Sequence, residues 1–139
     1  MTTLMNRLLS DFSCSSGASE EQIVAAEKSF GLQFPEDYRK FMSQSNGGEG
    51  FIGEHYLILC QIEDLFSLNR DYKVVEYAPG FIDFASTGGG DGFAFDVRQV
   101  PYCVYQMPFV GMSPDDSFLV ADSFGTLLER MAATNGPLF

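Results

Sequence analysis

The chain has 139 residues, of which 45% are hydrophobic, with fourteen Phe, six Tyr and no Trp. This length and composition predict one globular domain, residues 1–139, with an aromatic-rich core, and they exclude an intrinsically disordered chain. Nineteen acidic against eight basic residues give a formal charge of −11, which argues against nucleic acid and anionic membranes as partners because both attract clustered Lys and Arg.

The first predicted helix covers residues 2–12, where Leu4, Leu8 and Phe12 recur at helical spacing. Residues 13–19 are small and polar, and such a composition is typical of a loop.

Two further helices are predicted before residue 48. Ser19 and Gln22 have the spacing of a capping box, so a helix is predicted to follow Ser19 and to end at Gly31. The next helix is predicted to start at Pro35, whose fixed φ suits a first helical turn, and to stop at the Asn-Gly-Gly sequence of residues 46–48. Its apolar stripe is Tyr38, Phe41 and Met42.

The pattern then changes to strands. Residues 51–60 are predicted to form one strand, and residues 61–72 a short helix with Ile62, Leu65, Phe66 and Asn69 on one face. Apolar runs punctuated by Gly and Pro predict three consecutive antiparallel strands within residues 79–87, 91–99 and 102–110.

The chain is predicted to finish with a turn at residues 113–116 and a helix over residues 122–133. Asp122 or Ser123 is the expected N-cap of that helix. Helices first, a sheet in the middle and a helix at the end predict the α+β fold class.

The glycine-rich segment Gly88-Gly89-Gly90-Asp91-Gly92 raises the question of a phosphate or metal site. It lacks the Lys-Ser/Thr ending of a P-loop, and a predicted strand follows it where phosphate binding favours a helix N-terminus. Asp-Gly is a strong tight-turn signal. We therefore interpret the segment as a structural hairpin turn, with at least one glycine at positive φ.

Cys14, Cys60 and Cys103 are widely separated and form no CxxC pair, which argues against a zinc site. Cys60 and Cys103 lie in apolar runs and are predicted to be buried thiols in a reducing compartment. The sequence shows no signal-peptide pattern and no window of 18 apolar residues. We therefore expect a soluble, cytoplasmic protein.

Three segments, in this order along the chain, resemble the SMI1/KNR4 superfamily, also called SUKH. They are residues 34–53, with "FPEDY" and "NGG"; residues 77–98, with the glycine-rich hairpin and its Phe-Asp step; and residues 108–131, with "ADSFGTLLERM". The resemblance extends over about residues 18–131. It implies an α+β fold with a curved, mostly antiparallel sheet packed against N-terminal and C-terminal helices.

The resemblance also implies a binding role without a shared catalytic residue set. Many bacterial members of the superfamily are immunity proteins that neutralise secreted toxins, often nucleases, and fungal members regulate cell-wall synthesis through protein partners. The favoured interpretation is an immunity-type protein that binds a toxin. The alternatives are a regulatory or scaffold protein with a non-toxin partner and, less favoured, a small-molecule or metal-binding domain that uses the glycine-rich loop.

The residues themselves indicate no enzyme, no metal and no cofactor. His55 is the single histidine, and neither a nucleophile elbow nor a His-metal pattern accompanies it. The step from Asp91 to Asp96 lacks the ordered ligands of a calcium loop. Alternation within residues 93–96 places Phe93 and Phe95 on one face of the predicted strand and Asp96 on the other.

An acidic surface with aromatic side chains beside it suits a basic protein partner, because aromatic residues anchor interfaces and charge accelerates encounter. The candidate contact residues lie in or beside predicted turns: Glu49, Glu54, Asp91, Asp96, Asp115 and Asp116. The alternative is that these carboxylates only keep the protein soluble.

Overall fold

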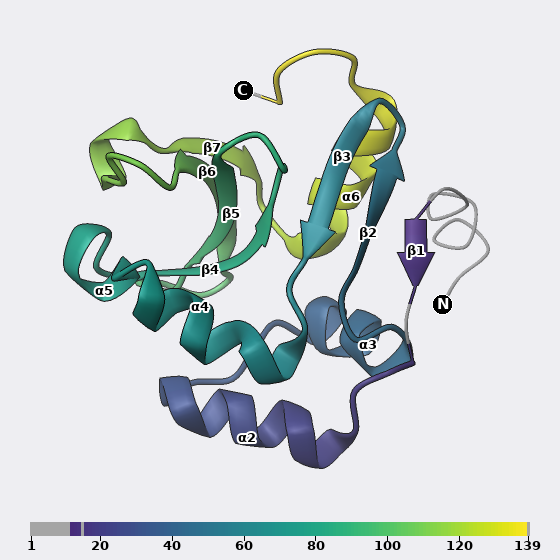
Figure 1. The fold of residues 1–139 in the computed structure, drawn as a ribbon, viewed down its shortest axis with the longest axis vertical. Coiled ribbons are helices and arrows are strands. Elements are labelled where there is room, and N and C mark those ends of the chain that lie inside the picture. The colour runs from purple at the N-terminus through teal and green to yellow at the C-terminus, as the bar shows by residue number, and fades with distance from the viewer. Residues whose placement is uncertain (1–11, 15, 139) are drawn as a thin grey trace.

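The computed structural model describes residues 12–14 and 16–138. It confirms the α+β class (Figure 1): a seven-stranded sheet in the order β1-β2-β3-β4-β5-β6-β7, in which each pair of neighbours is antiparallel, together with helices. Within the described residues, no helix combines the length and the apolarity that a membrane span requires.

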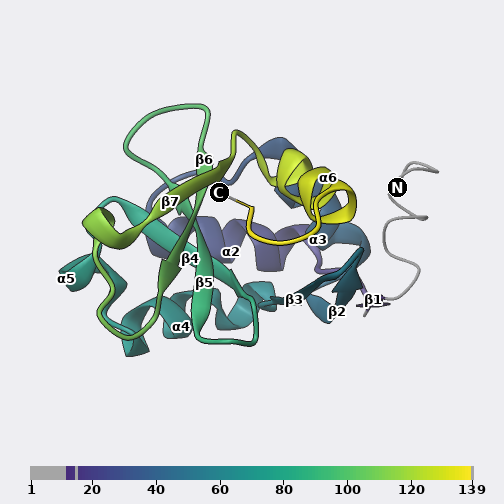
Figure 2. The same ribbon diagram turned by 90° about the horizontal axis from the view of Figure 1, so that it is seen from above.

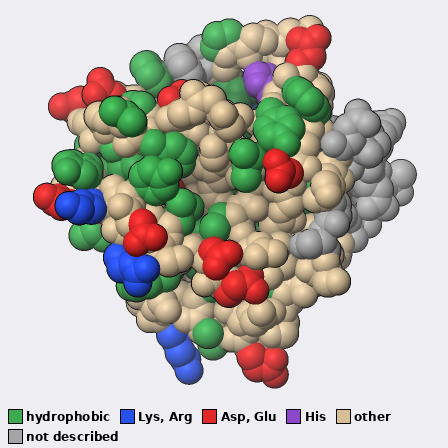
Figure 3. Space-filling model, in the orientation of Figure 1, with side chains coloured by type: hydrophobic (Ala, Val, Ile, Leu, Met, Phe, Trp, Pro, Cys, Tyr) green, Lys and Arg blue, Asp and Glu red, His purple; other side chains and the backbone are tan. Residues whose placement is uncertain are grey.

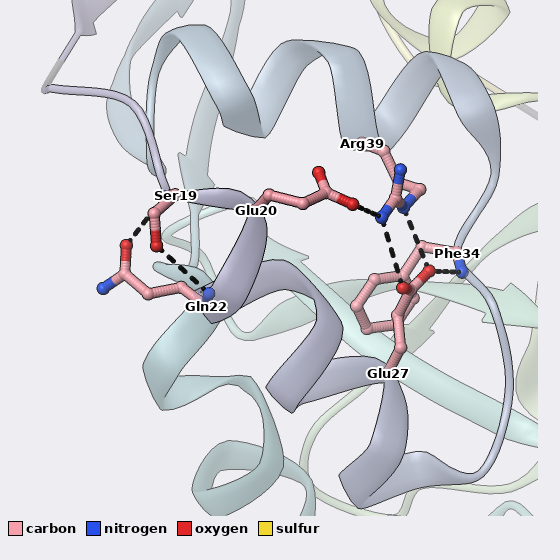
Figure 4. Close-up of polar contacts among 6 residues, drawn as sticks. All are labelled: Ser19, Glu20, Gln22, Glu27, Phe34 and Arg39. Atoms are coloured by element: carbon pink, nitrogen blue, oxygen red, sulfur yellow. Dashed lines mark hydrogen bonds and ion pairs between the residues drawn. The ribbon is translucent and has the colours of Figure 1, made fainter.

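The first two helices form where local signals predict them. α2 (Glu20–Phe30) begins with the predicted capping box, because the Ser19 N–H donates to Gln22 Oε1 over 2.9 Å and the Gln22 N–H donates to Ser19 Oγ over 3.1 Å (Figure 4). Gly31 ends it with a left-handed φ of 72°. α3 (Glu36–Gln44) follows Pro35 and buries the predicted stripe of Tyr38, Phe41 and Met42.

The predicted helix over residues 2–12 lies outside the described residues except for Phe12, which starts β1 (Phe12–Cys14). The predicted loop is therefore wrong at its first two residues. They pair with β2 (Gly48–Ile52), and the buried Phe12 ring packs edge-on against Phe41. This pairing joins distant parts of the chain, so local composition carries no sign of it.

The single strand predicted over residues 51–60 is also wrong, because the chain forms a hairpin there. β2 turns at Gly53 and Glu54 into β3 (His55–Leu59). Gly53 has a φ of 63°, and a Cβ on it would lie 2.8 Å from the Met131 carbonyl oxygen. The turn falls at Gly53 and Glu54, the glycine and the charged residue that separate two apolar stretches, so a local turn signal was present in the sequence.

The segment that follows confirms the predicted short helix and adds another. η1 (Ile62–Asp64) continues into α4 (Leu65–Asp71), and the unpredicted α5 (Val74–Tyr77) comes after Lys73, which has a left-handed φ of 56°. α4 and α5 pack against β4 (Phe81–Ser86).

The predicted meander is confirmed as β4, β5 (Asp91–Asp96) and β6 (Cys103–Pro108). The predicted turn at residues 113–116 contains η2 (Pro114–Asp116), and the sequence analysis missed the short β7 (Phe118–Ala121). α6 (Phe124–Ala133) closes the chain with Ser123 as its N-cap.

The sheet has apolar side chains buried on both faces. The main core lies between the sheet and helices α2, α3 and α6, and the Tyr38 ring contacts the rings of Phe84, Phe95 and Phe124 edge-on. A smaller cluster joins α5 to the other face: Val74, Ala78, Phe81, Ala94, Met107 and Met112. Figures 1 and 2 show α5 and α6 at opposite sides of the molecule. The predicted alternation in β5 holds, since Phe93 and Phe95 enter the main core and Ala94 the second cluster.

Candidate functional site

The glycine-rich loop joins β4 to β5, as predicted. Gly88 and Gly90 have positive φ angles of 81° and 104°, and the Thr87 N–H donates to the Asp91 carbonyl over 2.9 Å to close the turn. Asp91 and Gly92, however, are the first residues of β5 and pair with Pro108 and Met107. The prediction that Asp91-Gly92 forms the turn is therefore wrong, and the turn lies at residues 87–90.

Gly92 is glycine for a steric reason. A Cβ at this position would lie 2.7 Å from Cζ of Phe109 and 3.3 Å from the Ala85 carbonyl oxygen. The close approach of Phe109 to the backbone, and not a positive φ, explains the residue.

One exposed surface of the β2–β3 hairpin combines aromatic and acidic side chains. Ile52, Leu57 and Leu59 are buried in the main core. Side chains alternate along a strand, so the intervening residues point to the opposite face. We call this face the hairpin patch, and it consists of Glu49, Phe51, Tyr56 and Ile58.

The contacts within the hairpin patch are specific. Phe51 lies opposite Tyr56 in the register, and the two rings meet edge-to-face with centroids 5.0 Å apart. Phe51 nevertheless keeps 51% of its surface exposed. The Tyr56 hydroxyl donates to Glu49 Oε2 over 2.6 Å, and this hydrogen bond raises the pKa of Tyr56 above its ordinary value. The hydrogen bond fixes a carboxylate beside an accessible ring.

The glycine-rich loop lies against the hairpin patch. A Cβ on Gly88 would be 3.5 Å from Tyr56 Cδ2 and 3.6 Å from Ile58 Cδ1. Gly88, Gly89 and Gly90 are all exposed. In the orientation of Figure 1, Figure 3 shows hydrophobic side chains around a hollow between the β2–β3 hairpin and the strands to its left.

A small cavity of about 210 Å³ lies beside the hairpin patch, and Glu54, Thr87, Gln106 and residues 136–138 line it together with His55 and Tyr56. His55 Nε2 lies 2.6 Å from the Thr134 carbonyl oxygen, so the histidine ties β3 to the end of α6. Gln106 Nε2 donates to Asp91 Oδ2 over 2.9 Å. Glu54 and Asp91 are thus both near the junction of hairpin and loop.

The other predicted contact residues lie elsewhere. Asp96 is buried, and Arg98 Nε donates to its Oδ1 over 2.9 Å, which holds the pKa of Asp96 below its ordinary value. Asp115 and Asp116 are exposed on η2, and the β6–β7 connection that carries them lies across the molecule from the β2–β3 hairpin (Figures 1 and 2). The six predicted carboxylates do not form one patch.

Sequence reasoning missed the Phe51–Tyr56 pair, because a single continuous strand gives no cross-strand register. It also predicted buried thiols, and the structure bears this out only in part, because Cys60 and Cys103 are each partly buried. Burial of part of Cys60, with Asp64 and Glu63 nearby, raises the pKa of its thiol to about 12. Among the described residues, no group of three or more His, Cys, Asp or Glu side chains is arranged to hold a metal ion.

Comparison with known proteins identifies one family. The model described as "SMI1 / KNR4 family (SUKH-1)" matches residues 17–130, which is most of the chain and includes the hairpin patch, the glycine-rich loop and most of α6. No curated protein sequence matches the chain.

Proposed function

The chain belongs to the SMI1/KNR4 family (SUKH-1), and on this premise we propose that it is a non-catalytic, immunity-type protein that neutralises a toxin by binding it directly. Membership supports a protein-binding role of the immunity or SMI1/KNR4 kind. The proposed partner is a basic toxin domain, such as a nuclease, and the proposed place of action is the cytoplasm.

The observation that carries this proposal beyond the family match is the hairpin patch. Aromatic side chains, Phe included, are enriched at protein interfaces relative to the rest of the protein surface. Phe51 is such a residue, and Glu49 places a negative charge beside it. None of the seven strands, in the bounds that the structure gives them, contains a Lys or Arg. The strands themselves therefore carry no formal positive charge.

The proposal is tested by co-expression with the toxin domain of a large secreted protein encoded beside this gene. We expect the chain to restore growth of the host and to bind a purified, catalytically inactivated form of that toxin. A chain that neither restores growth nor binds the inactive toxin contradicts the immunity role, and a regulatory role with another partner then becomes the better explanation.

The ligand-binding alternative has a separate test. A screen of nucleotides and divalent ions by thermal shift detects a ligand that binds the native state, because such a ligand raises Tm progressively as its concentration exceeds its Kd. We expect no concentration-dependent rise. A rise that Asp91→Asn abolishes would favour a site at the glycine-rich loop.

Asp115 and Asp116 lie away from the hairpin patch, and we propose that they steer the partner without anchoring it. Reversing both charges to Lys is expected to slow association by about threefold at low salt and to leave dissociation unchanged. At about 150 mM salt, where the repulsion between exposed charges is screened, Tm is expected to stay nearly constant because both residues are exposed. Stopped-flow association at several salt concentrations measures the effect, and an unchanged association rate would remove the electrostatic argument.

A further inference from the structure

The hairpin patch contains a carboxylate that one hydrogen bond holds in place and that can accept further hydrogen bonds. Glu49 is exposed, and its Oε2 accepts the Tyr56 hydroxyl hydrogen. Its Oε1 accepts no hydrogen bond from any residue that the structure describes. Tyr56 thus holds the Glu49 carboxylate in a fixed orientation. A hydrogen-bond donor of a partner can bind this carboxylate without having to immobilise it first.

The loop beside this carboxylate adds further acceptors. The Gly88 and Gly89 N–H groups donate to Ser86 Oγ and Thr87 Oγ1, and the Gly90 carbonyl accepts from the Phe109 N–H. The carbonyl oxygens of Gly88 and Gly89 accept nothing from the described part of the chain. Because glycine has no side chain, a partner can approach this backbone closely.

We propose that Glu49, Phe51, Tyr56 and the loop at Gly88–Gly90 form an anchor site for an arginine side chain of the protein partner. The inference rests on the proposed protein-binding function and gives the chemistry of the group that is bound. A guanidinium carries five N–H donors in a planar fork, stacks on aromatic rings and pairs with carboxylates. The site offers surplus oxygen acceptors beside the exposed ring of Phe51.

Lysine fits this site less well than arginine. Its ammonium is a compact and strongly hydrated charge with three donors, and it does not stack in a plane. A second copy of the chain is disfavoured as the occupant, because the formal charge of −11 makes two copies repel each other. The proposal therefore predicts a preference between two cations of equal charge, which simple attraction to an acidic surface does not.

The test uses two peptides of equal length and charge, one of alternating Gly and Arg and the other of alternating Gly and Lys. Each is titrated into the full chain at low salt, and amide NMR shifts are followed. We expect the Arg peptide to bind about two- to fivefold more tightly than the Lys peptide, as stacking of an exposed cation on an aromatic ring predicts. The shifted amides should lie in the β2–β3 hairpin and in residues 87–90.

Three variants locate the effect. Glu49→Gln keeps an acceptor for the Tyr56 hydroxyl but removes the charge, so it should weaken the Arg peptide. Phe51→Leu should abolish the preference for Arg over Lys. Glu129→Gln removes one exposed charge from α6 and is the matched control, so it should leave the hairpin shifts and the preference unchanged.

Equal binding of the two peptides, shifts spread over the whole surface, or an equal loss in Glu129→Gln would each overturn the anchor site. Concentration-dependent shifts without peptide would assign the surface to self-association and would overturn it too. The outcome is separable from the proposed function. Toxin neutralisation that survives both Glu49→Gln and Phe51→Leu refutes the anchor alone, whereas Arg-selective binding by a chain that neutralises no toxin refutes the immunity role alone.

Discussion

At the scale of single residues, Asp83 is the side chain whose environment is hardest to reconcile with its chemistry. It is fully buried on β4, and neither carboxylate oxygen has a hydrogen-bond partner among the described residues. Asn69 forms hydrogen bonds with the backbone of Asp83 and not with its carboxylate: Asn69 Nδ2 donates to the Asp83 carbonyl, and the Asp83 N–H donates to Asn69 Oδ1. Burial raises the pKa of Asp83 to about 7.

Asp83 is expected to make the protein less stable as the pH rises from about 4 to 7. A folded-state pKa above the unfolded value means that the native state favours the protonated form, and that advantage is lost when the native carboxyl ionises. At about 1.4 kcal/mol per pKa unit, the free energy of unfolding should fall by at most roughly 4 kcal/mol over this pH range. Asp83→Asn should remove this pH dependence. Urea unfolding at pH 4 and pH 8 measures it. Equal pH dependence in the two proteins would contradict the assignment.

The glycine-rich loop gives a second prediction at this scale. Gly90→Ala should destabilise the protein by about 1 kcal/mol, because its φ of 104° disfavours a side chain. Gly92→Val should cost about 1–3 kcal/mol by displacing Phe109, and it should cost less in a Phe109→Ala background. Gly89→Ala is the matched control, since Gly89 has no positive φ and only a distant contact with Thr87. Thermal unfolding ranks the variants, and a Gly89→Ala loss equal to that of Gly92→Val would be inconsistent with this account.

At the scale of elements, Glu27 connects α2 to the start of α3. Its buried carboxylate accepts the Phe34 N–H over 2.7 Å and pairs with Arg39 Nε over 3.1 Å, while Arg39 also reaches the exposed Glu20 over 2.6 Å (Figure 4). The backbone of the connecting loop and the cation of α3 thus converge on one carboxylate.

Removing the buried acid should cost far more than removing the exposed one. Glu27→Ala leaves the Phe34 N–H and Arg39 without their acceptor and should lower the free energy of unfolding by about 3 kcal/mol. Glu20→Ala breaks only an exposed ion pair and should cost less than about 1 kcal/mol. Chemical denaturation of both variants tests the contrast. Similar losses in the two would mean that the Arg39 ion pairs, and not the buried acceptor, hold the helices together.

The elements that the sequence predicts correctly are those specified by neighbouring residues. The capping box at Ser19 and the left-handed Gly31 define α2 within a dozen residues, and Gly and Pro punctuate the β4–β5–β6 meander. β1 and β7 were missed because they are short, and each forms only by pairing with one neighbouring strand. The β2–β3 turn is an exception, because Gly53 and Glu54 give it a local signal that the sequence analysis did not use.

In the candidate site, too, the features specified by neighbouring residues could be predicted, and those that depend on strand pairing could not. Glu49 and the glycine-rich loop are visible in the sequence as a carboxylate and a turn. Their proximity depends on the register that places Phe51 opposite Tyr56 and Ile58 opposite Ser86. Charge counting does not distinguish Asp96 from Asp115. Only the fold shows that Asp96 is buried and paired with the half-exposed Arg98, whereas Asp115 is exposed. Tertiary pairing, not composition, decides which acids are available.

At the scale of the whole molecule, negative charge exceeds what the ion pairs neutralise. The formal charge is −11, and the ion pairs of the described residues use only Arg39, Arg70 and Arg98 as cations. The face shown in Figure 3 has acidic side chains scattered across it, with the basic ones at the left and lower left. Repulsion among like charges opposes the compact state and is reduced by salt.

Sodium chloride is therefore expected to stabilise this protein. Raising its concentration from about 10 mM to 150 mM shortens the screening length from about 30 Å to 8 Å. We expect Tm to increase by roughly 2–5 °C, because relief of repulsion outweighs the weakening of few exposed ion pairs. Asp115→Asn combined with Asp116→Asn should raise Tm at low salt and reduce the salt response, since the variant has less charge to screen. Scanning calorimetry across the salt series measures both, and a Tm that falls with added salt would show that the ion pairs dominate the electrostatics of the fold.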